Sequence, residues 1–208
     1  MRLRPGIGRR ERKMKKYLFL ALAAVFIFTA EVSADEKGCL EVIRSRKSVR
    51  NYTGVPATKE QLDTLLKAAM AAPSAMDRRP WAFVVVTDEG VLSKLASGLP
   101  NSQMIVSAKA AIVVCGVMDK TLAGPSQDFW VQDCSAASEN ILLAAEAIDL
   151  GAVWTGMYPS KARIAYVRSI LGIPQGVIPF NVIAVGNPVG TEKPKDKFNP
   201  DNIHWNKW

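Results

Sequence analysis

VIPFNVIAVG, residues 177–186, and AAIVVCGV, residues 110–117, are almost uninterrupted runs of apolar and β-branched side chains. A third run, WAFVVVT, covers residues 81–87, and a shorter one follows at residues 152–155. Strands with one solvated face alternate apolar and polar residues, whereas strands buried on both faces read as continuous apolar runs. These segments therefore predict a central sheet that is covered on both sides.

Helical patterns surround these strands. TKEQ at residues 58–61 has the spacing of a capping box, and residues 160–171 form a second helix behind a serine cap. The longest helical stretch, residues 129–150, is rich in Ala and Ser and stops before Gly151. Small side chains on several of its faces predict a central or dimer-interface helix. Helices and strands do not alternate strictly, so the expected class is α+β.

The N-terminus has the features of an export signal. Residues 17–30, YLFLALAAVFIFTA, are apolar, follow Met14-Lys15-Lys16 and precede the small-residue sequence Val32-Ser33-Ala34. The run is short for a membrane span, which needs about 20 residues. We expect residues 1–34 to be a leader and the protein to be exported to the periplasm or the membrane. An uncleaved leader would be a membrane anchor, and a non-functional one would leave the protein in the cytoplasm.

Charge and composition exclude several functions. The net charge is +8, but residues 1–34 hold eight of the 27 basic side chains and two of the 19 acidic ones, which leaves +2 for the rest. A nucleic-acid partner is therefore not expected. Three cysteines without C-x-x-C spacing and a single histidine, His204, predict neither a metal site nor a Ser-His-Asp triad.

A short basic segment is the first candidate site. RSRKSVRNY, residues 44–52, contains four cations and two serines, and the chain has no glycine-rich phosphate loop of either common type. Such a run alone is typical of a solvated helix end. If the protein binds a phosphorylated cofactor, however, side chains must hold it, and Arg guanidinium groups match phosphate oxygens two at a time.

Three further segments change the interpretation: PSAMDRRPW at residues 73–81, GAVWTGMYP at residues 151–159, and GNP at residues 186–188 with KPKDKF shortly after. Each alone is an ordinary connection, turn or charged tail. Together and in this order they resemble the nitroreductase family of FMN-dependent oxidoreductases, from about residue 41 to residue 208. The resemblance implies a central, mainly antiparallel sheet flanked by helices, in a single FMN-binding domain at residues 35–208.

The resemblance also assigns roles to individual residues. Arg46, Ser48 and Arg50 match the family's R-x-S-x-R pattern, in which the first two hold the phosphate and ribityl chain. The third lies near the pyrimidine end of the flavin, where a cation favours the reduced ring. The other residues that the resemblance places at the flavin are Lys47, Pro73, Ser74, Ala75, Met76, Asp77, Trp154, Thr155, Gly156, Lys195 and Lys197.

Within this set, the residues come from different parts of the implied dimer. Residues 73–76 match the family segment that lines the flavin from the neighbouring subunit, and Lys195 and Lys197 match the paired basic residues that close over the phosphate. The resemblance also implies that the backbone passes close to the flavin at Gly156, which glycine permits. Asp77 and Arg79 stand where the family commonly has Asn and Gln. An Asp can only accept a hydrogen bond, so the polarity around the pyrimidine is altered.

The implied function is redox chemistry on FMN. N5 of the flavin accepts a hydride from NAD(P)H, or electrons from another donor, and passes them in a ping-pong cycle to a flat nitroaromatic, quinone or similar acceptor. No side chain is expected to be catalytic and no metal is expected. We expect a homodimer, because the site draws on two subunits. The apolar C-terminal tail, residues 187–208, is expected to dock on the partner.

Two alternatives remain. The protein could be a non-catalytic or sensory FMN-binding module. It could also be a flavin enzyme of the same fold that carries out dehalogenation, flavin fragmentation or oxidative dehydrogenation.

Overall fold

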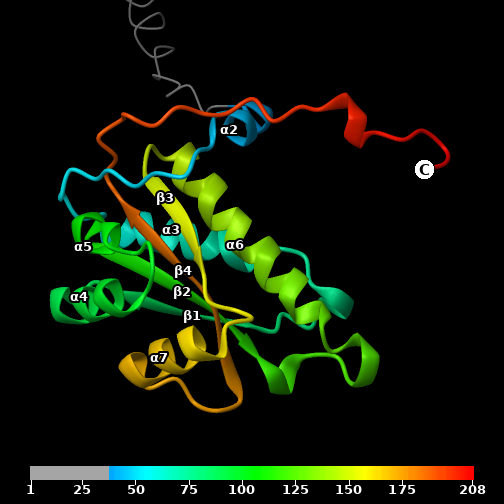
Figure 1. The fold of residues 1–208 in the computed structure, drawn as a ribbon, viewed down its shortest axis with the longest axis horizontal. Coiled ribbons are helices and arrows are strands. Elements are labelled where there is room, and N and C mark those ends of the chain that lie inside the picture. The colour runs from blue at the N-terminus through cyan, green and yellow to red at the C-terminus, as the bar shows by residue number, and fades with distance from the viewer. Residues whose placement is uncertain (1–37) are drawn as a thin grey trace, which may run out of the picture. The chain divides into compact units, whose positions relative to one another are not determined.

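The strands predicted from the sequence form one sheet. In the computed structural model, which describes residues 38–208, β1 (Trp81–Val86), β2 (Ala110–Val117), β3 (Gly151–Gly156) and β4 (Val177–Gly186) lie in the order β1-β2-β4-β3 (Figure 1). All three neighbouring pairs are antiparallel. The predicted bounds are correct for β2 and β4 and differ by one residue at the ends of β1 and β3. The predicted α+β class with a mainly antiparallel sheet is confirmed.

Six α-helices and four short 3₁₀ turns accompany the sheet within residues 38–208. The helices are α2 (Cys39–Ser45), α3 (Lys59–Met70), α4 (Glu89–Gly98), α5 (Met104–Ala108), α6 (Phe129–Ala147) and α7 (Lys161–Leu171). The turns are η1 (Ala75–Asp77), η2 (Met118–Lys120), η3 (Gly124–Ser126) and η4 (Pro200–Asn202). The sequence patterns predicted α3, α6 and α7 but not α2, α4 or α5.

The predicted helix caps are present. The backbone N–H of Gln61 donates to Thr58 Oγ1 at 3.2 Å, and the N–H of Thr58 donates to Gln61 Oε1 at 2.9 Å, which completes the capping box of α3. Ser160 caps α7, and Gly172 ends it in the left-handed region with φ +64°. That conformation favours glycine because it carries no Cβ.

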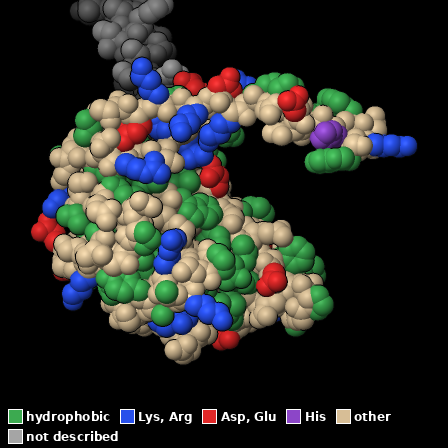
Figure 2. Space-filling model, in the orientation of Figure 1, with side chains coloured by type: hydrophobic (Ala, Val, Ile, Leu, Met, Phe, Trp, Pro, Cys, Tyr) green, Lys and Arg blue, Asp and Glu red, His purple; other side chains and the backbone are tan. Residues whose placement is uncertain are grey.

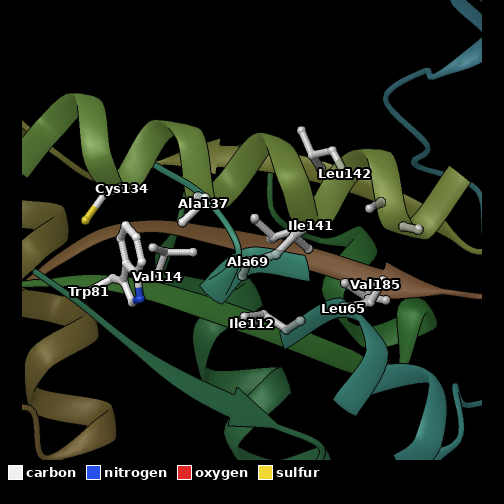
Figure 3. Close-up of a cluster of buried hydrophobic side chains, with 14 of the residues drawn as sticks. Leu65, Ala69, Trp81, Ile112, Val114, Cys134, Ala137, Ile141, Leu142 and Val185 are labelled. Atoms are coloured by element: carbon white, nitrogen blue, oxygen red, sulfur yellow. The ribbon is translucent and has the colours of Figure 1, made fainter. Parts of the chain in front are cut away.

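The sheet is buried on both faces, as the continuous apolar runs predict. Ile112 and Val114 of β2 point into a core formed with α3 and α6, which is shown in Figure 3. The alternate residues Ala111, Val113 and Cys115 point into a second core formed with α4, α5 and α7. Because both faces are covered by helices, functional groups must lie at the ends of the strands or along their edges.

Helix α6 ends earlier than predicted, and its end is important for the site. The predicted helix runs to residue 150, but α6 ends at Ala147, and Asp149 takes a left-handed conformation with φ +58° before β3 begins. At Gly151 an added Cβ would lie 2.6 Å from Cγ1 of Val49. Gly151 thus lets the segment around residue 49 approach β3 closely.

The described residues belong to one compact unit, Lys37–Trp208. The leader predicted at residues 1–34 lies outside the described residues. Among residues 38–208, no helix combines the length and the apolar composition that crossing a bilayer requires.

Candidate functional site

Arg44 and Ser45 of the basic segment end α2, and the residues after them are extended and lie against β3. Ser48 forms a parallel bridge with Ala152, and the N–H of Val49 donates to the carbonyl of Ala152 at 3.1 Å. Val49 is 2% exposed and belongs to the second core. Successive side chains of an extended chain point to opposite sides, so Arg46, Ser48 and Arg50 share the side away from Val49.

Two glutamates of α6 form ion pairs with this segment. The Lys47 ammonium lies 2.9 and 3.1 Å from the two carboxylate oxygens of Glu146, and Arg46 Nε lies 3.0 Å from Glu139 Oε1. Glu139 and Glu146 are seven residues apart, which is two helical turns, so they lie on one face of α6. The Glu146 side chain is only 8% exposed, so this pair is a largely buried anchor for the segment.

The C-terminal segment, residues 187–197, runs beside the basic segment. The N–H of Thr53 donates to the carbonyl of Asn187 at 2.9 Å, and the N–H of Val189 donates to the carbonyl of Asn51 at 3.0 Å. Glu192 Oε1 then accepts hydrogen bonds from the backbone N–H groups of Arg50 and Asn51 at 2.8 and 2.9 Å. These contacts join parts of the chain that are more than 130 residues apart.

The electrostatics of Glu192 reflect this arrangement. Partial desolvation raises the pKa of its carboxyl, but the hydrogen bonds from the backbone N–H groups of Arg50, Asn51 and Glu192 itself and from the Thr191 hydroxyl together outweigh that effect and hold the pKa below its ordinary value. The carboxylate is therefore ionised at neutral pH, and its hydrogen bonds are charge-assisted.

Together the two segments enclose a basic cavity of about 410 Å³. Its lining consists of Arg46, Lys47, Ser48, Arg50, Glu192, Lys193, Lys195 and Lys197. A second cavity, of about 480 Å³, adjoins it and shares Arg46, Lys195 and Lys197; its remaining lining residues are Ile43, Arg44, Pro194, Asp196 and Phe198. Figure 2 shows Lys and Arg side chains gathered beside the C-terminal segment. Six cations around one carboxylate favour an anion in the first cavity.

The structure thus brings together six of the predicted site residues from the two ends of the domain: Arg46, Lys47, Ser48, Arg50, Lys195 and Lys197. Lys47 borders the cavity, but its ammonium is held by Glu146. The sequence patterns did not indicate Glu139, Glu146 or Glu192, and they included Lys193 in the KPKDKF motif without a role for it. The sequence contains one sign of Glu146, because this residue is an acid inside the apolar stretch LLAAEAIDL at residues 142–150.

The loop at residues 73–79 is a separate feature and lines neither basic cavity. Asp133 of α6, which is buried, accepts a hydrogen bond from the N–H of Ala75 at 2.9 Å. Met76, Asp77 and Arg79 all have left-handed backbones, with φ between 48° and 52°. Non-glycine residues in this region cost about 1 kcal/mol or more each, and such strain gathers at functional sites.

The loop contains an ion pair between Asp77 and Arg79. Arg79 donates from Nε and Nη2 to the two carboxylate oxygens of Asp77, at 2.7 and 2.6 Å. The hydrogen bonds from Arg79 hold the pKa of Asp77 below its ordinary value. Both residues are exposed, and the preceding Met76 is 82% exposed. That residues 73–77 reach a flavin from a neighbouring subunit stays a prediction.

The third predicted group lies at the end of β3. Trp154 packs edge-on against Phe180, Thr155 donates from Oγ1 to the carbonyl of Val182, and the carbonyl of Gly156 accepts from Arg163 Nη1. A Cβ at Gly156 would meet no atom within 4 Å. The packing of the described chain therefore does not require glycine there, and these three residues do not line the basic cavities.

The fold and this site define a class: an antiparallel four-stranded sheet between helical layers, with a basic cavity built from both ends of the domain. The model of the Nitroreductase family matches residues 43–187. A protein of Archaeoglobus fulgidus, named as a candidate NADH dehydrogenase/NAD(P)H nitroreductase, is 44% identical over 173 residues, which cover 82% of this chain and 98% of the relative. The chain belongs to the nitroreductase family.

Solved structures agree with this assignment. The crystal structure of a candidate NADH dehydrogenase/NAD(P)H nitroreductase from Parabacteroides distasonis has 50% sequence identity and a TM-score of 0.77, with 82% of this chain and 98% of that chain covered. An FMN-dependent nitroreductase from Clostridium difficile has 28% identity and a TM-score of 0.74, with coverages of 81% and 99%. The resemblance stated from the sequence motifs is therefore confirmed.

Proposed function

We propose that the protein is an FMN-dependent oxidoreductase that takes electrons from NAD(P)H and delivers them to a flat acceptor such as a nitroaromatic or a quinone. The basic cavity between residues 46–50 and 193–197 carries the proposal. Membership of the nitroreductase family and similarity to an FMN-dependent nitroreductase support it.

The residues of the cavity fit a phosphate monoester. Such a group carries between about 1.5 and 2 negative charges at neutral pH and offers three acceptor oxygens. Arg46, Ser48, Lys195 and Lys197 supply a guanidinium, a hydroxyl and two ammonium groups around one cavity. These four would hold the phosphate of FMN. Arg50 would stand toward the ring, where a cation lowers the energy of the negative charge gained on reduction.

When bound, FMN supplies the redox chemistry between the nicotinamide donor and the acceptor. The side chains of the protein bind and orient the reactants, and we propose no catalytic acid, base or nucleophile. Glu139 keeps Arg46 in place, and Glu146 keeps Lys47 in place, through the ion pairs described above. The strained loop at residues 75–79 would contribute to the ring end of the site on the partner subunit.

A homodimer is part of the proposal. The C-terminal tail passes α2 and then leaves the rest of the unit (Figure 1), and it exposes Phe198, Ile203, Trp205 and Trp208. Trp205 is 85% exposed and Trp208 is fully exposed. Large apolar side chains at a chain end imply a surface that covers them, and the partner subunit would provide it. We also propose that residues 1–34 direct export.

Anaerobic stopped-flow mixing with NADH and with NADPH tests the function. The purified protein should be yellow, release FMN on denaturation, and lose its flavin absorbance rapidly with at least one of the two donors. Addition of a quinone or a nitroaromatic should then restore the absorbance. A protein that keeps FMN but is not reduced by either donor would support the non-catalytic binding module, and a colourless protein that cannot be reconstituted with FMN would refute the proposal.

A further inference from the structure

Glu192 is an acid in a cavity of cations. It lines the 410 Å³ cavity together with six lysines and arginines from the basic segment and the tail. By Coulomb repulsion alone, a carboxylate at this position weakens the binding of an anion. The contacts of Glu192 point to a different effect.

The carboxylate ties two segments together. Its Oε1 accepts hydrogen bonds from the N–H of Arg50 at 2.8 Å, from the N–H of Asn51 at 2.9 Å and from Asn51 Nδ2 at 3.1 Å. Asn51 Nδ2 also donates to Thr191 Oγ1 at 3.2 Å. Three donors on one oxygen fix the end of the segment that enters the cavity.

Within residues 38–208, Glu192 is also the last residue of the tail that is hydrogen-bonded to the basic segment. Hydrogen bonds at Asn187, Val189 and Thr191 precede it, whereas the hydrogen bonds beyond it in the described chain stay within the tail, such as that from the N–H of Phe198 to Asp196 Oδ1 at 3.0 Å. Lys193, Lys195 and Lys197 follow Glu192 directly. Their place over the cavity therefore depends on the position at which Glu192 is held.

We propose that Glu192 is a positioning residue for anion binding: it fastens the C-terminal segment to residues 50–51 and thereby holds Lys195 and Lys197 over the phosphate cavity. The inference rests on the proposed function only in naming FMN as the anion. When a binding-competent arrangement is populated for only a fraction of the time, the apparent affinity falls by that fraction. Loss of the tie thus lowers affinity even though it removes a negative charge.

The direction in which the Kd for FMN changes tests the inference. In FMN titrations followed by flavin fluorescence, E192A should raise the Kd about tenfold, the result for lysines in place about a tenth of the time. E192Q keeps an oxygen acceptor at the same position without the charge, so its Kd should stay near that of the wild type or fall. D196A is the matched control, because it removes an acid of the adjoining cavity that, within residues 38–208, accepts a hydrogen bond only from the N–H of Phe198. Its Kd should not rise.

A Kd for E192A equal to or below that of the wild type would overturn the inference. A second measurement does not depend on FMN. Without cofactor, trypsin should cleave after Lys195 and Lys197 several times faster in E192A than in the wild type, E192Q or D196A, while the thermal midpoint of unfolding stays within about 2 °C because only the tail is released. Equal cleavage rates would overturn the positioning role. If the wild type binds no FMN but E192A is cleaved faster, the tie stands and the proposed function fails.

Discussion

Replacement of Lys47 by methionine tests the anchor beneath the candidate site. The substitution keeps most of the length of the side chain but leaves the Glu146 carboxylate, 8% exposed, without the ammonium that lies 2.9 and 3.1 Å from its oxygens. Breaking a buried pair by removing one partner costs about 3–5 kcal/mol. Lys47 is itself 22% exposed, so we expect the lower end, about 3 kcal/mol.

The loss is measured by thermal and urea denaturation followed by circular dichroism. For a domain of this size, about 3 kcal/mol corresponds to a fall of roughly 6–12 °C in the thermal midpoint. The double variant K47M/E146L replaces the pair with two apolar side chains and should recover most of the stability, because well-packed apolar pairs often match buried ion pairs. A loss below about 1 kcal/mol in K47M, or a double variant no more stable than K47M, would refute the assignment of a buried anchor.

Two further predictions use other parts of the structure. G151A places a Cβ 2.6 Å from a buried valine of the basic segment, so it should lower the stability by about 2 kcal/mol through overpacking and also weaken FMN binding. The Cβ of G156A meets nothing within 4 Å, so this control should unfold at the wild-type temperature. Equal thermal midpoints for the two variants would contradict the close approach at Gly151. Burial raises the pKa of the Cys115 thiol to about 12, so the thiol stays protonated at pH 8, and a disulfide reagent at that pH should modify exposed Cys39 in the native protein but leave Cys115 and Cys134 unmodified until denaturant is added. Rapid modification of all three thiols would contradict the buried cores.

The sequence predicted the strands well because the sheet is covered on both faces. Two-sided burial leaves an apolar run with clear ends, as in β2 and β4. The helices that it missed are short. Helix α5 has five residues, and α4 begins at an Asp88 cap whose Oδ1 accepts from the N–H of Val91, a local signal that was available but is weak without a long apolar pattern.

The candidate site was predicted in part. Arg46, Ser48 and Arg50 could be found because the segment is local and its residue types suit phosphate. The pairings of Glu146 and Glu192 could not be found, since their partners lie 99 and about 140 residues away and no local pattern records a long-range pairing; the acid within an apolar stretch at Glu146 marks the residue but not its partner. The same limit applies to the loop at residues 73–79: its motif was recognised, but its three left-handed residues became visible only in the structure.

The central claim is that side chains at residues 46–50 and 195–197 hold the phosphate of FMN, and a comparison of FMN with riboflavin tests it most directly. The two ligands differ only in the phosphate. Charge-assisted contacts contribute about 1.5–3 kcal/mol each, so the wild type should bind FMN at least about 100-fold more tightly than riboflavin, and R46A/S48A should lose most of that ratio while its affinity for riboflavin changes little. Equal affinities of the wild type for the two ligands, or an unchanged ratio in R46A/S48A, would contradict the claim.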